Sequence, residues 1–283
     1  LPENSRQHLI DLYFGEDGIG LTLGRVHINS CDFSPKSYSF DDVVDDFELK
    51  YFDDDVSHDQ ATMLPFIREA QVALARNGRE LKLIASPWSP PAWMKAPQMQ
   101  RTTSNGNKKE DYVQTMLGSA DPAGLLPDRR VHKAWAKYIT RFVDAYKHQG
   151  VKIWAVTPQN EPEFAAPWEA CKYNATAESS WINDYLGPIL KGANPEILIL
   201  AFDHNKDHLF DWAQTLMNAD DANYVDGLAF HWYAGLSREM DGAYGYENVL
   251  KAYNLAPDKL FINTEGCSCP GTSFDERRSW FRA

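Results

Sequence analysis

Two glutamates follow short apolar segments at points where paired carboxylates could do chemistry. Glu161 is the second-to-last residue of "IWAVTPQNEP" (153–162), and Glu265 follows "LFINT" (260–264). A carboxylate directly after a buried strand loses solvation free energy unless a partner or a function compensates for it. Glycoside hydrolysis needs two such groups, one to protonate the leaving oxygen and one to attack the sugar or to activate water. Each glutamate alone could instead cap a helix or form a salt bridge, so the hypothesis depends on the pair.

The elements around these glutamates alternate between apolar strands and amphipathic helices. We predict strands at 18–28, 81–86, 153–156, 197–202, 227–230 and 260–263. We predict a helix end at 5–14 and helices at 65–76, 133–148, 177–191 and 207–218. In this order the strands are parallel, and their continuous apolar runs indicate that both faces of the sheet are buried.

Polar and aromatic residues gather just after each predicted strand, as they do at the carboxyl ends of the strands in a (β/α)8 barrel. A doubly wound sheet would instead collect its ligand residues at one switch point, and no Gly-x-Gly-x-x-Gly follows any strand. We therefore predict a single barrel domain over residues 1–283. Six strands are recognisable where a closed barrel needs eight, and the long segment 96–130 does not supply the others. We expect the first and last strands to be missing, with an exposed sheet edge on each side.

Local signals refine the predicted helices. Asn77-Gly78 is expected to end the helix at 65–76, whose apolar face includes Phe66. Thr176 is a candidate N-cap for the helix at 177–191, which should be distorted at Gly187-Pro188.

Composition narrows the function classes. The formal net charge of −12 argues against nucleic-acid binding, and no apolar run is long enough to span a membrane. The nine Trp, thirteen Tyr and fourteen Phe are compatible with a cleft that stacks sugars, although most of these rings would be core. The cysteines, which we interpret as mostly free thiols, are Cys31, Cys171, Cys267 and Cys269. Since the chain begins with Leu1, we expect a removed leader or a piece of a longer protein, and Asn174-Ala-Thr176 is a glycosylation sequon.

A second kind of chemistry is suggested by "DHNKDH" (203–208). His204 and His208 have the i, i+4 spacing of metal ligands on a helix, which would suit a metal-dependent hydrolase. However, His204 ends a predicted strand, Asp207 looks like the N-cap of the next helix, and no further ligands are evident. We therefore predict no metal and no cofactor.

Several segments together resemble the catalytic domain of glycoside hydrolase family 30. They are "GIGLTLGRVHINSCDFS", "ASPWSPPAWMK", "WAVTPQNEP", "AFHWY" and "NTEGC". The resemblance implies a retaining β-glycosidase in which Glu161 is the general acid/base and Glu265 the nucleophile. It further implies an accessory β-sandwich, which we expect to be missing from this chain.

The resemblance also assigns supporting roles. Asn160 would bond the sugar 2-hydroxyl, and Asp32 and Trp88 would bind the non-reducing sugar. Arg25 would lie below the nucleophile and keep it ionised, with Asp203 behind the site. His231, Trp232 and Tyr233 would form the floor and wall. The alternatives are structural: packing for Trp88 and Trp232, an ion pair between Arg25 and Asp32, and a core position for His231. We also expect a raised pKa at Glu161 from apolar neighbours and the second carboxylate.

Glucosylceramide is the substrate that the resemblance favours, with transient contact with a membrane surface or an activator protein. β-1,6-Glucanase, xylanase and β-xylosidase activities remain open on the same scaffold. A non-catalytic sugar- or lipid-binding barrel would require loss of a carboxylate, and both are present. The family implies a secreted or a lysosomal or vacuolar location.

Overall fold

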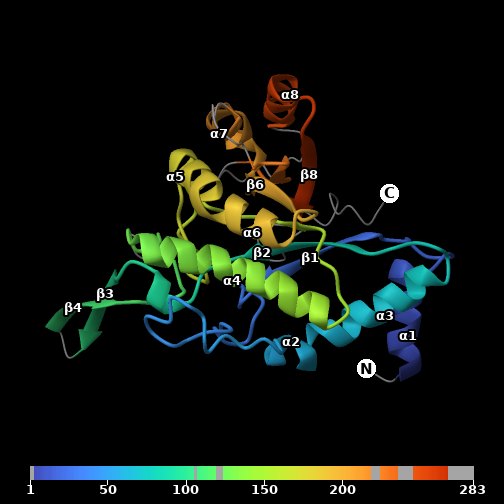
Figure 1. Ribbon diagram of the computed structural model, residues 1–283, viewed down its shortest axis with the longest axis horizontal. Coiled ribbons are helices and arrows are strands. Elements are labelled where there is room, and N and C mark those ends of the chain that lie inside the picture. The colour runs from blue at the N-terminus through green and yellow to red at the C-terminus, as the bar shows by residue number, and fades with distance from the viewer. Residues whose placement is uncertain (1–2, 105–106, 119–123, 218–223, 235–244, 267–283) are drawn as a thin grey trace.

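Six parallel strands form one curved sheet in the computed structural model, which describes residues 3–104, 107–118, 124–217, 224–234 and 245–266. The strand order is β1-β2-β5-β6-β7-β8, so neighbours in the sheet are also consecutive along the barrel (Figure 1). The strands are β1 (Leu23–Ile28), β2 (Lys82–Pro87), β5 (Ala155–Val156), β6 (Leu198–Asn205), β7 (Gly227–His231) and β8 (Leu260–Glu265). The predicted incomplete barrel is confirmed, since these residues supply six of the eight strands that a closed barrel has.

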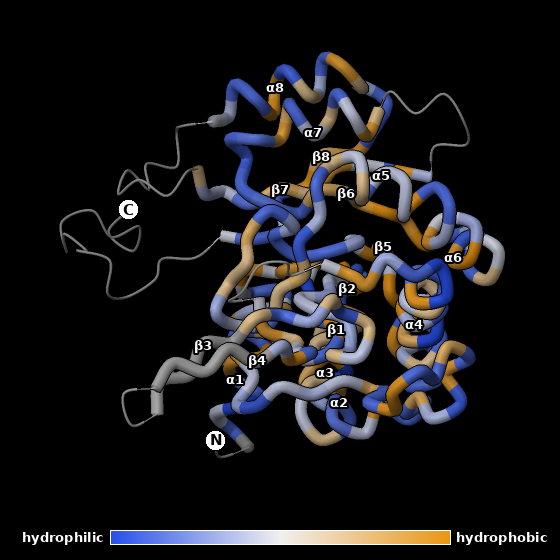
Figure 2. The backbone as a smooth tube through the Cα atoms, turned by 90° about the vertical axis from the view of Figure 1, so that its left-hand side faces the viewer, coloured by the Kyte–Doolittle hydropathy of each residue, from blue (hydrophilic) through white to orange (hydrophobic). Residues whose placement is uncertain are grey.

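Helices lie along the outside of this sheet, and each connection between consecutive strands contains at least one of them. They run from α3 near β1, through α4 and α6, to α7 and α8 at the end of the sheet that holds β6 to β8, and α7 packs against β6 and α8 (Figure 2). The helices are α1 (Glu3–Phe14), α2 (Ser57–Ala61), α3 (Met63–Ala75), α4 (Arg129–His148), α5 (Ala175–Trp181), α6 (Gly187–Ala193), α7 (Leu209–Leu216) and α8 (Tyr246–Leu255). None of the described helices is long and apolar enough to cross a membrane.

Apolar side chains fill both faces of the sheet, which explains the continuous apolar runs in its strands. Between the sheet and the helices, α4 contributes Trp135, Tyr138 and Phe142, all fully buried as its periodicity predicts. A smaller cluster on the other face takes one residue from each of four adjacent strands, namely Ile84, Ala155, Leu200 and Ala229. This second cluster is the interior of the partial barrel.

The segment after β2 contains structure that the sequence did not reveal. A 3-10 turn covers Ala92–Met94, and β3 (Gln98–Ser104) pairs antiparallel with β4 (Asn107–Val113). This hairpin forms a separate two-stranded sheet, so the described residues of the segment 96–130 add no strand to the barrel, as predicted.

The helix predicted at 177–191 begins earlier and is interrupted. Asn174, rather than Thr176, is the N-cap, and its Oδ1 accepts a hydrogen bond of 2.8 Å from the backbone N of Ala177. After α5 the backbone forms a π-helical turn at Ile182–Leu186, and α6 then starts at Gly187. A Cβ at Gly187 would lie 2.2 Å from the Tyr224 ring, so the distortion predicted at Gly187-Pro188 also allows a close approach.

Two further local predictions are wrong. β6 extends to Asn205, and Asp207 lies in a 3-10 turn (Lys206–His208) instead of capping α7, because the chain continues the strand past a bulge. Phe66 is 51% exposed, since it lies on the outer side of α3, where its ring meets Phe14 of α1 edge-on at 5.8 Å. The predicted helix ending is confirmed, because Gly78 adopts a positive φ of 65° just beyond α3.

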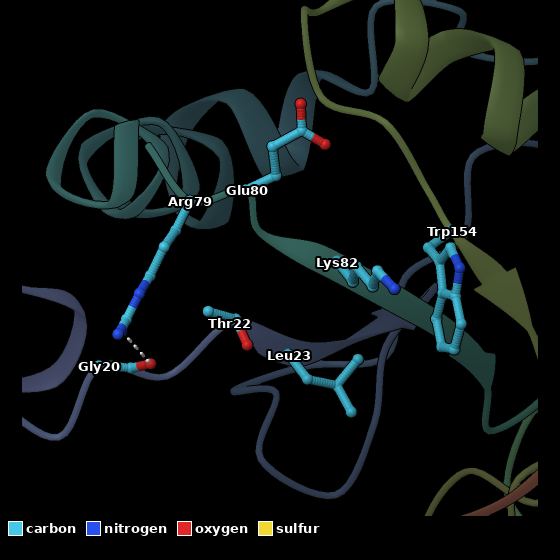
Figure 3. Close-up of a pocket in the computed structure, with 7 residues that line it drawn as sticks. All are labelled: Gly20, Thr22, Leu23, Arg79, Glu80, Lys82 and Trp154. Atoms are coloured by element: carbon cyan, nitrogen blue, oxygen red, sulfur yellow. Dashed lines mark hydrogen bonds between the residues drawn. The ribbon is translucent and has the colours of Figure 1, made fainter. Parts of the chain in front are cut away.

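A surface hollow of about 710 Å³ lies at the amino ends of β1 and β2 (Figure 3). Its lining includes Leu23 and Lys82, the first residues of those strands, and Trp154 just before β5. The two glutamates that could do chemistry lie at the opposite, carboxyl ends of the strands. This hollow is therefore separate from the candidate active site.

Candidate active site

Arg25, in β1, joins residues from four other parts of the sheet. Its Nη1 donates to Glu265 Oε2 at 2.7 Å. Its Nη2 donates to Asn160 Oδ1 at 2.8 Å and to Asp203 Oδ2 at 2.7 Å, and Nε donates to Ser86 Oγ at 2.9 Å. Burial disfavours the charged guanidinium, but Asp203 and Glu265 outweigh it and raise the pKa of Arg25. The alternative ion pair between Arg25 and Asp32 is not formed.

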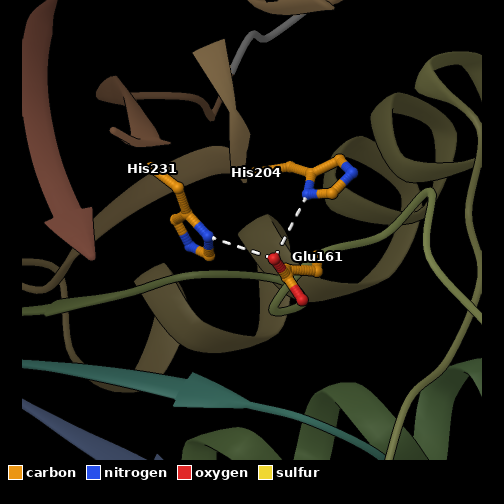
Figure 4. A group of neighbouring side chains, drawn as sticks. All are labelled: Glu161, His204 and His231. Carbon is orange, nitrogen blue, oxygen red and sulfur yellow. Dashed lines mark ion pairs between the residues drawn. The ribbon is translucent and has the colours of Figure 1, made fainter. Parts of the chain in front are cut away.

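His231, the last residue of β7, lies between the two glutamates and is fully buried. Its Nδ1 is 3.5 Å from Glu161 Oε1 (Figure 4). Its Nε2 is 3.2 Å from Asp203 Oδ1 and 3.8 Å from Glu265 Oε2. Burial alone would lower the pKa of this imidazole, but Asp203, Glu161 and Glu265 raise it to about 9. His231 is thus a buried cation in contact with both glutamates, which is neither a wall residue alone nor a neutral core histidine.

Glu161 has the opposite pKa shift to the one predicted. Burial alone would raise the pKa of Glu161, but its contact with His231 outweighs burial, and the pKa is lowered. The prediction was wrong because the nearest strand-end neighbour is a cationic imidazole as well as a second carboxylate. A carboxylic acid with a lower pKa is a stronger proton donor, but it is protonated only at more acidic pH.

The backbone around Glu161 is strained and held from β6. Glu161 adopts a left-handed φ of 47°, and its N–H donates to the carbonyl of Asp203 at 3.0 Å. Asp203 itself has φ 50° and Phe202 has φ 79°, where the register of β6 shifts against β7. Left-handed non-glycine residues cost free energy and persist where the surrounding structure enforces them, often at functional sites.

Asp203 is fully buried and serves as the common acceptor behind the site. Besides Arg25 and His231, the hydroxyls of Thr157 and Thr264 donate to it at 2.7 Å and 2.6 Å. Burial would raise its pKa, but Arg25, His231 and Thr264 hold the pKa well below the usual range. The sequence analysis missed both threonines, although each stands inside a segment quoted for the resemblance, "WAVTPQNEP" and "NTEGC".

Two of the proposed sugar-binding side chains lie against Arg25. Asn160 uses its Oδ1 to accept from Arg25, which leaves the amide Nδ2 to donate to a hydroxyl. Trp88 is 7% exposed, and the Arg25 guanidinium carbon lies 4.7 Å from its ring centroid. Asp32 exposes much of its surface to solvent, but neighbouring atoms partly desolvate its carboxyl group. This desolvation and the negative charge of Glu265 raise the pKa of Asp32.

Trp232 and Tyr233 surround the end of β8. The Trp232 N–H donates to the Glu265 carbonyl at 3.0 Å, and the Trp232 ring lies against Gly266, where a Cβ would be 2.8 Å from it. The Tyr233 hydroxyl donates to Glu265 Oε1 at 3.3 Å. Glu265 therefore has donors on both carboxylate oxygens, from Tyr233 and from Arg25.

His204 and His208 both approach Glu163 Oε2, but they are not a ligand pair on one helix. His208 is 57% exposed and its Nδ1 lies 2.7 Å from Glu163 Oε2. His204 lies 3.8 Å from the same oxygen through Nε2, while its Nδ1 faces Glu161 Oε1 at 3.8 Å. The spacing failed as a metal signal because His204 belongs to a strand and His208 to a 3-10 turn.

Two of the four cysteines lie in the part of the chain that the structure describes. Cys31 and Cys171 are buried free thiols, as predicted. Cys267 and Cys269 lie outside the described residues.

Comparisons with known proteins point to one family. The profile of the glycosyl hydrolase family 30 TIM-barrel domain matches residues 1–282. Putative glucosylceramidase 3 of Caenorhabditis elegans is 35% identical over 100% of this chain and 50% of its own length. Lysosomal acid glucosylceramidase of Mus musculus is 29% identical over 97% of this chain and 50% of its own length. The chain thus spans about half the length of these curated relatives.

Solved structures agree with the sequence comparison. SrfJ from Salmonella typhimurium superposes with a TM-score of 0.76 at 32% identity, over 96% of this chain and 54% of its own. The endo-β1,6-glucanase BT3312 superposes with a TM-score of 0.75 at 25% identity, over 95% of this chain and 53% of its own. Since the family profile covers nearly the whole chain and the fold agrees, this chain belongs to glycosyl hydrolase family 30.

Proposed function

We propose that the complete protein hydrolyses β-glucosides by a retaining double displacement, with Glu265 as nucleophile and Glu161 as general acid/base. The observation that carries the proposal is the unequal environment of two carboxylates that share His231. Arg25 and Tyr233 donate to the two oxygens of Glu265, which holds this carboxylate in a fixed orientation for attack. Glu161 has no arginine partner among the described residues. Its ion-pair partners there are the imidazoles of His204 and His231, which can change how readily Glu161 gives up its proton.

In the first step, Glu265 attacks the anomeric carbon while Glu161 donates its proton to the leaving oxygen. Negative charge then appears on Glu161, and the cationic His231 at 3.5 Å stabilises that charge. Asn160 Nδ2 is positioned to donate to the sugar 2-hydroxyl, since Arg25 already holds the amide oxygen.

In the second step, Glu161 accepts a proton from a water molecule as the water attacks the glycosyl ester, and Glu265 leaves as a carboxylate. Arg25 remains beside the departing carboxylate, so the charge reappears where a donor already stands. This preorganisation is supported by Asp203, which holds Arg25 and His231 from behind.

Glucosylceramide is the substrate we propose, since the relatives with matching sequence include proteins named glucosylceramidases. We further propose a lysosomal or vacuolar or a secreted location, and transient contact with a membrane surface or an activator protein to reach a glycolipid. A low pKa at Glu161 supports work in an acidic compartment, because the acid form of Glu161 is then populated.

A β-1,6-linked glucan is a second candidate substrate, and the Glu163–His208 pair favours it. This pair is partly exposed and adjoins His204, whose Nδ1 faces Glu161, the group that we propose protonates the leaving oxygen. Polar groups there suit a sugar leaving group better than an alkyl chain. The similar structure of an endo-β1,6-glucanase supports the same candidate.

Proton NMR of aryl β-glucoside hydrolysis by the complete protein tests the reaction class. We expect the β-anomer of glucose to appear first, with no loss of rate when a chelator is added. First appearance of the α-anomer, or no hydrolysis of any β-glucoside, would refute the proposal. Parallel rates on glucosylceramide and on a β-1,6-glucan decide between the two substrates.

A further inference from the structure

Three side chains at the carboxyl ends of β5 to β7 present metal-ligating atoms to one point. Glu161 Oε1, His204 Nδ1 and His231 Nδ1 all lie within 4.8 Å of one another (Figure 4). Glu161 Oε1 is 3.5 Å from His231 Nδ1 and 3.8 Å from His204 Nδ1. Tetrahedral Zn²⁺ with bonds of about 2.0–2.2 Å separates its ligand atoms by about 3.4 Å. The two distances from Glu161 Oε1 exceed this separation by about 0.1 and 0.4 Å, whereas the two imidazole nitrogens, which lie within 4.8 Å of each other, would approach by up to about 1.4 Å.

Both imidazole nitrogens that face this point lack a hydrogen bond of normal geometry. The Nδ1 atoms of His204 and His231 are buried, and neither has a hydrogen-bond partner among the described residues. His231 is fully buried and His204 is 8% exposed. Buried polar atoms are normally satisfied, so two such nitrogens aimed at one carboxylate oxygen indicate a place where a further group can bind.

The far nitrogens of both rings are backed by carboxylates. His231 Nε2 lies 3.2 Å from Asp203, and His204 Nε2 lies 3.8 Å from Glu163. A carboxylate behind a ligating histidine fixes the ring and increases its basicity as a ligand. Two histidines and one glutamate leave a fourth position open, as in exchangeable zinc sites.

We propose that Glu161, His204 and His231 bind a divalent transition-metal ion, with Zn²⁺ as the best-fitting ion, and that the bound ion blocks the site. A ligated Glu161 carboxylate has no proton to donate, so the ion acts as a reversible inhibitor. A metal ion binds only a neutral imidazole, so the ion displaces the proton that His231 otherwise holds toward Glu161. This inference concerns a second ligand and does not depend on which glycoside is cleaved.

Isothermal titration of the complete protein with zinc chloride at about pH 8 tests the proposal. We expect one ion per chain, with affinity reduced at least about 10-fold in His204→Ala and in His204→Gln. The matched control is His148→Ala, which removes an exposed histidine at the end of α4 and should leave the affinity unchanged. Circular dichroism of each variant establishes that it is folded, and the glutamine variant retains side-chain volume if the alanine variant does not fold.

Equal affinity in wild type and both His204 variants would overturn the proposal, as would the absence of a one-to-one isotherm in the wild type. Loss of binding in His148→Ala would also overturn it, because that result assigns the ion to the surface. The titration contains no glycoside, so its outcome is separate from the proposed hydrolysis. A protein that binds zinc and cleaves no glucoside keeps the metal site, and one that cleaves glucosides without binding zinc keeps the proposed function.

Discussion

The Nδ1 atom of His231 lies 3.5 Å from Oε1 of Glu161, and His231 is fully shielded from solvent. This contact lowers the pKa of Glu161 although its burial acts in the opposite direction. A general acid with a lowered pKa loses its proton at a more acidic pH, so the alkaline limb of the activity profile should lie on the acidic side.

Replacing His231 with glutamine should move that limb. The variant removes the cation beside Glu161, so the pKa of Glu161 should rise and the acid form should persist to higher pH. We expect the alkaline limb of kcat/KM for an aryl β-glucoside to shift upward by about one pH unit, together with a lower maximum because Asp203 loses a partner.

A His148→Gln variant, changed at an exposed position on α4, is the control and should keep the wild-type profile. An unchanged limb in His231→Gln would show that His231 does not set the pKa of the catalytic acid. A limb displaced to lower pH would contradict the sign of the effect.

The strands, and the reactive residues that follow them, could be predicted from the sequence because buried parallel strands are continuous apolar runs. Glu161 and Glu265 were found in this way, each at the first charged position after such a run. The bulge in β6 could not be predicted, since Phe202 and Asp203 adopt positive φ without being glycines. Nothing local in a sequence marks such residues, and tertiary contacts enforce them.

The charge interactions and pKa shifts within the site could not be predicted from the sequence either. Arg25 contacts Ser86, Asn160, Asp203 and Glu265, whose separations along the chain range from 61 to 240 residues. The pKa of Glu161 was mispredicted for the same reason, because a local reading of "NEP" contains no information about a histidine two strands away.

Arg25 should be a strong determinant of stability. Arg25→Met leaves Asp203, which is fully buried, without its cationic partner and removes the donor to Glu265. Leaving a buried charge uncompensated costs about 3–5 kcal/mol, so the free energy of unfolding should fall by that order. Urea unfolding of the complete protein followed by circular dichroism measures it.

Arg6→Met is the comparison for Arg25→Met, since Arg6 is 54% exposed in its ion pair with Glu69. That change should cost less than about 1 kcal/mol because exposed ion pairs contribute little. Similar losses in the two variants would mean that the buried network around Asp203 contributes no more than a surface pair.

Glu178 predicts a specific pH dependence of stability. Its carboxyl is fully buried and accepts from the backbone N of Phe202 at 2.9 Å, and burial raises its pKa from 4.5 to about 8. The unfolded chain releases this proton near pH 4.5, whereas the folded chain keeps it to about pH 8. The stabilisation is therefore complete below pH 4.5 and is lost as pH rises through 8.

Glu178→Gln removes this titration while retaining an acceptor for the Phe202 N–H. Between about pH 5 and 8 we expect wild-type unfolding free energy to fall, relative to the variant, by on the order of a few kcal/mol. Denaturant titrations at several pH values give the two slopes. Parallel pH dependences for the wild type and Glu178→Gln would rule out a proton held by Glu178 in the folded state.

The most direct test of a retaining mechanism at Glu265 is mass spectrometry of the complete protein after reaction with an activated 2-deoxy-2-fluoro-β-glucoside. The fluorine slows the second displacement, so the glycosyl-enzyme should accumulate. We expect the mass to increase by one fluoroglucosyl group, located on the peptide that contains Glu265, and no increase in Glu265→Gln. A Glu196→Gln variant, changed at an exposed carboxylate, should label like the wild type. An active enzyme that acquires no label, or that carries it on another residue, would contradict the assignment.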